Sequence, residues 1–206
     1  MQFPESWLRE FCNPPLTTEQ LAETLTMAGL EVEGMVEIGA GLDSVIVARL
    51  DSVEQHPDAD RLTVCQVNNG TEVVQVVCGA TNHKTGDLVA LAQIGTILPG
   101  NFKIKKAKLR GVESFGMLCA ESELGLTEQS DGLMILSSDA PTGSCIREYL
   151  LLDDKCVDVD LTPNRSDCLS IAGLAREVGV LNKEQVTAPK FEAVSISHNE
   201  TFSVKI

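Results

Sequence analysis

The sequence predicts an α+β protein in which a small Greek-key β-barrel is inserted into a bipartite α+β domain. Three observations predict this arrangement: helical periodicity near both ends of the chain, a run of short strand-like segments in its middle, and glycine- or proline-rich breaks between the two patterns. The chain has 206 residues, of which 43% are hydrophobic and 4% aromatic. That composition suffices for one large core or two small ones.

The first 39 residues predict two helices followed by a strand. Pro4 is suited to the start of the first helix. Thr17 offers a cap for the second helix, which should end at Gly29. Residues 30–36 then alternate as a strand would, and the glycine-rich segment from Gly39 marks a linker and the first domain boundary.

From residue 44 to about residue 136 the pattern changes to short β-rich runs separated by turn signals. Five strands at this spacing predict a small barrel, with the OB type the leading candidate and a β-sandwich the alternative. The five segments are VIVARLDSV, LTVCQV, VVQVVCG, LVALAQI and FKIKKAKL.

After residue 150 the chain returns to mixed structure, with a strand predicted over residues 157–161 and a helix over 168–181. Residues 1–39 have too little apolar surface to fold alone. We therefore expect residues 1–39 and 151–190 to form one bipartite domain, with a barrel domain over residues 40–150 inserted between them. Residues 191–206 alternate and then stop in mid-strand, which predicts the start of a following, truncated domain.

The charge of the chain is strongly negative and uneven. The formal net charge is -14, and none of the three predicted segments is basic as a whole. A broad electrostatic attraction to nucleic acid or to an anionic membrane is therefore not expected. Against this background, residues 103–110 place five cations within eight residues.

This cationic stretch is predicted to be one strand with a bulge near Lys105-Lys106. The bulge would bury the three apolar side chains and leave the five cations, Lys103, Lys105, Lys106, Lys108 and Arg110, outward. Such a rim suits contact with phosphates, but lysines also protect edge strands from aggregation, and the charges alone favour neither interpretation. Because aromatic residues are sparse, recognition of the nucleic-acid backbone is favoured over base stacking.

The cysteines and histidines indicate neither disulfides nor a metal site. Seven cysteines, an odd number with no CxxC pair, predict reduced thiols that serve mostly as small core residues of a cytoplasmic protein. The three histidines have no zinc-ligand spacing. The apolar runs are too short for a membrane-spanning helix.

No constellation of residues predicts catalysis in this chain, because the sequence lacks a nucleophile elbow and a phosphate loop. His56-Pro57-Asp58 is interpreted as a loop whose side chains satisfy local amides. For residues 163–167 a structural role is favoured over ligand binding: Ser166 or Asp167 would cap the following helix while Arg165 pairs with a carboxylate.

Three motifs, in order, carry a resemblance to a known family: HPDADRLTVCQV, CGATN and ILPGNFKIKKAKLRGVESFGMLCAESELGL. They resemble the tRNA-binding barrel shared by several synthetases and by free-standing tRNA-binding proteins. The resemblance implies an OB fold. It also implies that Lys103, Lys105, Lys106, Lys108, Arg110 and Ser114 lie in the region that contacts tRNA.

The segments before and after the predicted barrel narrow the resemblance to one family. WLREF, TMAGLEVE and LTPNRSDCLSIAGLAREVGVL are similar to the amino-terminal part of the bacterial phenylalanyl-tRNA synthetase beta-subunit family. That resemblance implies a cytoplasmic α2β2 enzyme that attaches phenylalanine to tRNA with ATP and Mg2+. Catalysis would reside in the alpha subunit and editing in a later beta domain, so this fragment would contain no catalytic residue, metal or cofactor and would be inactive alone.

Two alternatives to an accessory tRNA-binding region remain open at this point. One is a free-standing tRNA-binding module, although an isolated barrel needs no bracketing domain. The other is a purely architectural region whose basic rim serves subunit assembly. DNA and membranes are not expected as partners.

Overall fold

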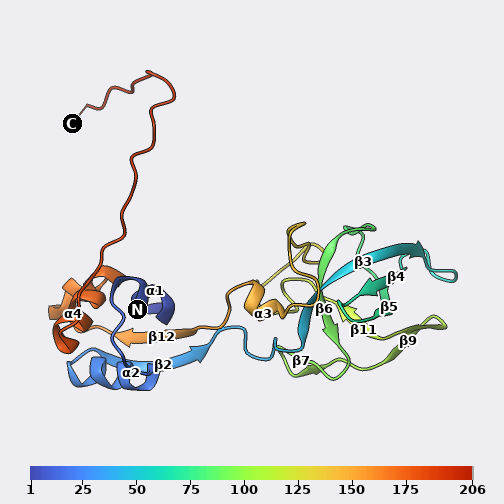
Figure 1. Cartoon of the computed structure of the whole chain (residues 1–206), viewed down its shortest axis with the longest axis horizontal. Helices are drawn as coiled ribbons and strands as arrows, with labels where there is room; N and C mark the ends of the chain where they lie inside the picture. Colours follow the sequence, from blue (N-terminus) through green and yellow to red (C-terminus); the bar gives the residue numbers. More distant parts are fainter. Residues whose placement is uncertain (206) are drawn as a thin grey trace. The chain divides into compact units, whose positions relative to one another are not determined.

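The computed structural model describes residues 1–205, and the chain divides into two compact units (Figure 1). The first unit combines Met1–Gly34 with the chain from Val157 onward, and the second contains Met35–Cys156. The chain passes from the first unit to the second within strand β2 and returns within strand β12. Each unit has its own apolar core.

Helices and a three-stranded sheet of order β1-β12-β2 make up the first unit. Its core joins side chains from both chain segments, including Leu8 and Leu25 from the first and Val159 and Leu174 from the second. The elements are β1 (Gln2–Pro4), α1 (Glu5–Phe11), α2 (Thr18–Met27), β2 (Glu31–Glu37), β12 (Lys155–Asp160), the 3-10 helix η1 (Pro163–Cys168) and α4 (Ile171–Asn182).

Local signals fix the helix ends of this unit. Thr17 caps α2 through a capping box: its Oγ1 accepts from the Gln20 amide at 3.3 Å, while Gln20 Oε1 accepts from the Thr17 amide at 2.9 Å. Gly29 follows α2 with φ of 84°, the left-handed conformation expected at a helix end. The predicted helix starts near Pro4 and Thr18 are therefore confirmed.

The second unit is dominated by an antiparallel sheet of order β11-β6-β3-β4-β5. Its two end strands come together, because the Phe115 amide beside β11 donates to the Gln75 carbonyl of β5 at 2.9 Å, so the sheet forms a nearly closed barrel. The elements are β3 (Val45–Gln55), β4 (Thr63–Asn68), β5 (Val73–Cys78), β6 (Leu88–Gln93), β7 (Ile97–Leu98), β8 (Phe102–Lys103), β9 (Ala107–Leu109), β10 (Val112–Ser114), β11 (Gly116–Leu118) and α3 (Ile146–Tyr149).

Strand β3 is the longest strand and lets the sheet curve. Its first half pairs with β6 and its second half with β4, and the register shifts between Leu50 and Ser52. A bulge of this kind bends a strand and increases its twist. The buried side chains of this unit form two clusters: one joins Leu50 of β3 to Val67 of β4 and Leu91 of β6, and the other joins Val47 of β3 to residues outside the sheet such as Ile146.

Both ends of the second unit are fixed by one arginine. The Arg147 side chain, 13% exposed, contacts carboxylates of Glu37 at 2.6 Å, Asp43 at 3.2 Å and Asp153 at 2.8 Å. The Ile38 amide also donates to the Asp154 carbonyl at 2.9 Å. The chain therefore enters and leaves this unit at neighbouring positions.

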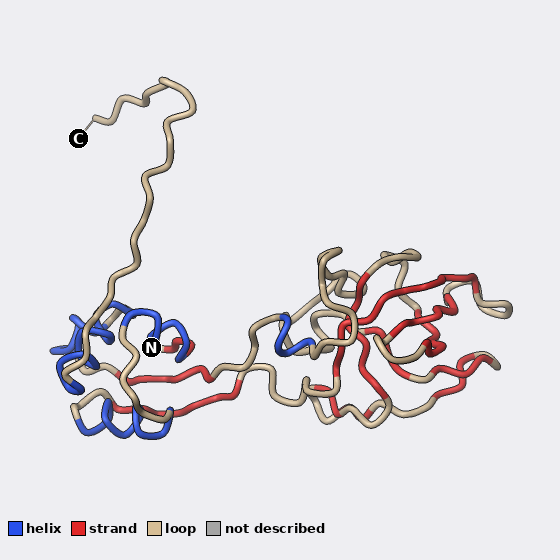
Figure 2. The backbone as a smooth tube through the Cα atoms, in the orientation of Figure 1, coloured by secondary structure: helices blue, strands red, loops and turns tan. Residues whose placement is uncertain are grey.

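Two predicted strands differ from the structure (Figure 2). Residues 102–109 do not form the fifth barrel strand but divide into β8 and β9, which pair with β7 and β10, and the fifth strand is β11. The alternating segment from residue 194 forms no strand through residue 205, and Ile206 lies outside the described residues. No helix of the described residues has the length and apolar character to cross a bilayer.

Candidate nucleic-acid interface

The predicted cations gather on a segment that we call the cationic hairpin, residues 103–114. Strands β9 and β10 pair in register, with Leu109 opposite Val112 and Lys108 opposite Glu113. The turn between them is Arg110-Gly111, with φ of 45° and 91°. Two successive residues of positive φ are typical of the two-residue turns that match the twist of a hairpin.

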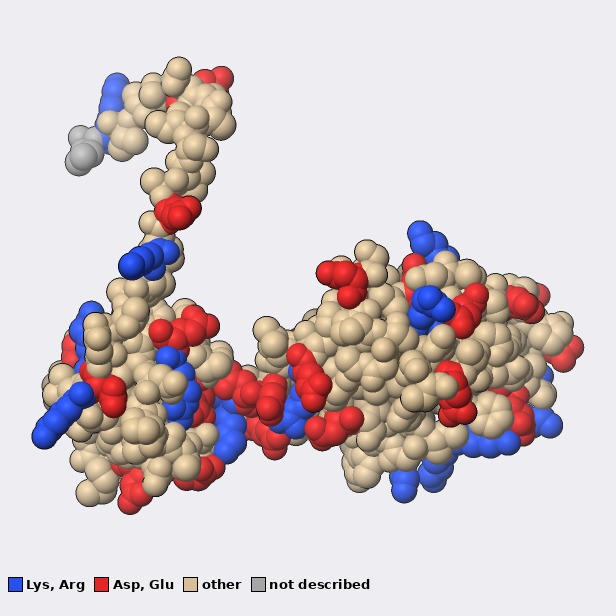
Figure 3. Space-filling model, viewed as in Figure 1, with Lys and Arg blue, Asp and Glu red and all other residues tan. Residues whose placement is uncertain are grey.

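All five predicted cations of the hairpin are exposed, so the expectation that they point outward is confirmed. Figure 3 shows basic side chains along the same edge of the second unit at which Figure 1 places β9. Lys106 Nζ lies 2.9 Å from Glu113 Oε1 and 4.6 Å from the centroid of the Phe115 ring. Within residues 1–205 the other four form no ion pair: Lys103, Lys105, Lys108 and Arg110.

The predicted bulge is wrong in its details. Ile104 is buried, and its amide donates to the Thr96 carbonyl at 2.8 Å, which anchors the start of the hairpin to the barrel. Ala107 and Leu109, however, are exposed instead of buried. The reason is that β9 leaves the barrel sheet and pairs only with β10, so neither face of the hairpin is fully covered.

Ser114 holds the base of the hairpin. It is 2% exposed, and its Oγ accepts from the Val77 amide at 3.1 Å and donates to the Gly116 carbonyl at 3.0 Å. A buried hydroxyl that already donates its hydrogen and accepts one hydrogen bond has little to offer a ligand. In this arrangement Ser114 positions the strands that carry the cations.

One residue at this interface was not recognised as a site residue from the sequence, namely His56. It is 2% exposed, its Nδ1 accepts from the Asp58 amide at 3.0 Å, and its Nε2 lies 3.1 Å from the Leu109 carbonyl oxygen of the hairpin. The sequence interpretation of local amide contacts is thus confirmed. The second contact spans 53 residues of sequence, and no local pattern indicates it.

The CGATN motif and the end of the motif that carries the hairpin meet in a hollow of about 420 Å³. Its lining includes residues 78–80 of the first motif and Met117, Leu118 and Ala120 of the second. Asn82 is the last residue of the CGATN motif. Its side chain accepts a hydrogen bond from the Leu133 amide and donates one to the Leu133 carbonyl, both at 2.9 Å. Motifs that are far apart in sequence therefore form one side of the barrel.

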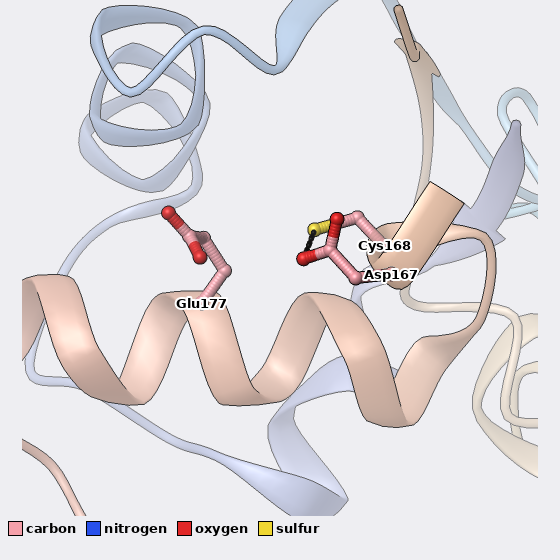
Figure 4. A group of neighbouring side chains, drawn as sticks. All are labelled: Asp167, Cys168 and Glu177. Atoms are coloured by element: carbon pink, nitrogen blue, oxygen red, sulfur yellow. Dashed lines mark hydrogen bonds between the residues drawn. The ribbon is translucent and has the colours of Figure 1, made fainter. Parts of the chain in front are cut away.

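The side chains of Asp167, Cys168 and Glu177 include metal-ligand types and lie close together in the first unit (Figure 4). Arg165 supplies the positive charge among them, since its Nη2 lies 3.0 Å from Glu177 Oε2 and its Nε lies 3.3 Å from Asp167 Oδ1. Hydrogen bonding to this guanidinium lowers the pKa of Asp167, whereas burial raises the pKa of the Cys168 thiol. The arrangement is that of an ion-paired cluster.

The predicted pairing of Arg165 with a carboxylate is confirmed, but the predicted cap is not. Helix α4 is capped by Ser170, whose Oγ accepts from the Gly173 amide at 3.1 Å. Residues 163–168 form the separate helix η1, so neither Ser166 nor Asp167 occupies the capping position.

Comparisons with known proteins identify the family of the chain. Residues 45–145 match the family described as "Putative tRNA binding domain". The chain is 61% identical over 176 residues to the phenylalanine–tRNA ligase beta subunit of Syntrophotalea carbinolica, covering 85% of this chain and 22% of that protein. It is 54% identical over 206 residues to the beta subunit of Hahella chejuensis, covering 100% of this chain and 26% of that protein.

Among solved structures, a MetRS related protein from Pyrococcus horikoshii matches with a TM-score of 0.38 and 22% identity, covering 50% of this chain and 87% of that one. The chain spans about a quarter of the length of the curated relatives that it matches. Similarity to those relatives extends over both units and is not confined to the barrel. The chain therefore belongs to the family of phenylalanine–tRNA ligase beta subunits and carries a tRNA-binding domain over residues 45–145.

Proposed function

We propose that this chain is the amino-terminal accessory region of a phenylalanine–tRNA ligase beta subunit, and that its cationic hairpin contacts the tRNA backbone. The observation that carries the proposal is the group of four exposed cations without carboxylate partners, on a hairpin that extends from a tRNA-binding domain. Lys and Arg side chains that neutralise phosphates release condensed counterions and so gain affinity. The contact residues are Lys103, Lys105, Lys106, Lys108 and Arg110, and Ser114 contributes by holding the hairpin.

The second unit corresponds, in this proposal, to an OB-type barrel domain of residues 40–150. The first unit corresponds to the bipartite α+β domain of residues 1–39 and 151–190, and residues 191–206 begin a following domain. Support comes from the nearly closed antiparallel sheet of order β11-β6-β3-β4-β5. In OB folds, ligands bind near the loop between the first two strands and the loop before the last, which here are residues 56–62 and 94–115.

The parent enzyme would attach phenylalanine to tRNA with ATP and Mg2+, as a cytoplasmic α2β2 assembly. The relatives are named as ligase beta subunits, which supports a role in a ligase and implies an alpha partner. Because this chain corresponds to about a quarter of those relatives, we place catalysis, ATP and Mg2+ outside it. The fragment alone is then expected to be inactive.

A charge-reversal triple variant tests the proposed contact surface. We expect Lys105, Lys106 and Lys108 changed to Glu to weaken binding of a phenylalanine-accepting tRNA transcript. The slope of log affinity against log salt should also fall by about 2 to 3, because each neutralised phosphate contributes roughly 0.7–0.9 to that slope. Fluorescence titration at several salt concentrations measures both quantities.

The matched control reverses the same number of charges away from the hairpin. Lys84, Lys190 and Lys205 are exposed, and changing all three to Glu produces the same net charge. We expect this control to lower affinity only slightly and to leave the salt slope unchanged. Equal losses in the two triple variants would show that net charge, and not the hairpin, governs binding. Absence of tRNA binding in the wild type, together with loss of alpha-subunit assembly when the barrel is deleted, would favour an architectural role.

A further inference from the structure

We propose that His56 is a positioning residue that holds the cationic hairpin in the orientation that meets tRNA phosphates, an inference that rests on the proposed function. His56 lies in the loop between β3 and β4, whereas the hairpin precedes the last barrel strand. The imidazole joins these two loops through the backbone of Leu109.

The loop that carries His56 is itself well fixed. The His56 amide donates to the Leu62 carbonyl at 3.0 Å, and Gln55 Nε2 donates to the carbonyls of Ala59 and Leu62, both at 3.1 Å. The imidazole is also buried, with 2% exposure. The ring therefore presents a fixed hydrogen-bonding group to the hairpin.

The neighbours of the ring define its tautomer. The Asp58 amide can only donate, so Nδ1 must be the acceptor of that bond. In the neutral imidazole the other nitrogen, Nε2, then carries the hydrogen. Nε2 is thus the donor to the Leu109 carbonyl oxygen at 3.1 Å, and the two contacts of the ring are mutually consistent.

The two strands of the hairpin are attached to the barrel very differently. On the β10 side, Gln75 Nε2 donates to the Glu113 carbonyl at 2.7 Å and Ser114 bonds to Val77. On the β9 side, one hydrogen bond joins residues 107–111 to a residue outside the hairpin, counting all residues that the structure describes, 1–205. It is the contact from His56 to Leu109. Lys108 and Arg110 flank the residue it holds.

Loss of this bond should leave the outer half of the hairpin free to reorient. Cations that move independently bind phosphates less well, because ordering them on binding costs free energy that a preorganised surface avoids. Fewer of them would engage at once, which also lowers the salt dependence of binding. A general loss of barrel stability would weaken binding without this change in slope.

Two substitutions separate the contacts of the ring. In His56→Asn, the amide oxygen can replace Nδ1 as acceptor from Asp58, but no atom reaches Leu109. In His56→Gln, the amide nitrogen can replace Nε2 as donor to Leu109, but the Nδ1 acceptor is missing. Both variants are made in the 206-residue chain, with thermal unfolding measured to confirm that the barrel is folded.

Hydrogen exchange of residues 107–112 and titration with a phenylalanine-accepting tRNA transcript across salt are the two readouts. We expect His56→Asn to accelerate exchange in the hairpin, to weaken binding about three- to ten-fold, as for one lost hydrogen bond, and to reduce the salt slope. His56→Gln should remain close to the wild type in all three respects.

The proposal is overturned if both variants behave as the wild type. It is also overturned if His56→Gln loses as much tRNA affinity and hairpin protection as His56→Asn, because the Leu109 contact would then not be the cause of the loss. A separate outcome concerns the proposed function alone. If the wild type does not bind tRNA but His56→Asn still loosens the hairpin selectively, tRNA binding by this surface fails while the positioning role of His56 is supported.

Discussion

Single side chains of the cationic hairpin differ in what they can contribute. Lys106 is engaged by Glu113 at 2.9 Å and by the Phe115 ring at 4.6 Å. Exposed ion pairs and cation–π contacts are each worth roughly 0–1 kcal/mol, so these contacts orient Lys106 more than they stabilise the fold. Its charge is partly offset by Glu113, and the local positive potential comes mainly from the other four cations.

Buried thiols should be chemically inert in the folded protein. Burial raises the pKa of Cys119 to about 12 and that of Cys78 to about 11. Since only the thiolate reacts and pH 8 lies well below this pKa, Cys119 should be almost entirely in the unreactive thiol form. We expect iodoacetamide at pH 8 to modify the half-buried Cys145 and Cys156 first, as read by mass spectrometry.

Unfolding provides the control for this labelling. In concentrated guanidinium the burial is lost, so all seven cysteines should react at similar rates. Raising the pH from 7 to 9 should leave Cys119 protected, because its pKa remains well above that range. Rapid modification of Cys119 in the folded protein would contradict the burial of this strand end.

Among the secondary-structure elements, those with local signals were predictable. The capping box at Thr17 identifies α2, and the short β-rich runs between turn residues identify β3 to β6. Strand β11 was missed because three residues starting at Gly116 show no alternation, and its place is set by pairing with β6. The cations of the hairpin were found from charge, but His56 was not, because its contact to Leu109 depends on tertiary structure.

Helix α4 makes a close approach to η1 that requires glycine. A Cβ on Gly173 would clash with the Asp167 carbonyl oxygen. Glycine to alanine normally stabilises a helix interior by about 1 kcal/mol, but here we expect Gly173→Ala to destabilise the first unit by about 1–3 kcal/mol through overpacking. Urea unfolding measures the difference.

Gly34→Ala is the matched control, since a Cβ there meets nothing within 4 Å. Its stability should stay close to that of the wild type. If Gly173→Ala were neutral or stabilising, the approach of α4 to η1 would have to be looser than the structure shows.

On the scale of the whole molecule, the cationic hairpin is a local concentration of positive charge in an acidic chain. The net charge is -14, so the long-range field should repel nucleic acid, and under the proposed function we expect binding to come from close contacts at the hairpin. We therefore expect tRNA binding of modest affinity and strong salt dependence.

The barrel unit should fold when excised, provided that both of its ends are kept. We expect residues 35–156 to unfold cooperatively in a thermal melt followed by circular dichroism. Residues 45–145, the extent of the family match, should be less stable by about 2 kcal/mol or more. The shorter piece lacks the fully buried Leu42 and Ile146 and the ion pairs of Arg147. Equal melting temperatures for the two pieces would show that these end contacts contribute nothing to the stability of the barrel.

The core of the first unit joins side chains from the two ends of the described chain, such as Leu8 and Leu174, and this has a consequence for synthesis on the ribosome. Translation at roughly 5–20 residues per second takes on the order of ten seconds to pass through residues 35–156. The first 34 residues must wait for that time without their partners, while the barrel emerges complete. The nascent barrel is therefore expected to fold first. Until their partners emerge, the apolar side chains of the amino-terminal segment stay exposed, and we expect a chaperone to bind them.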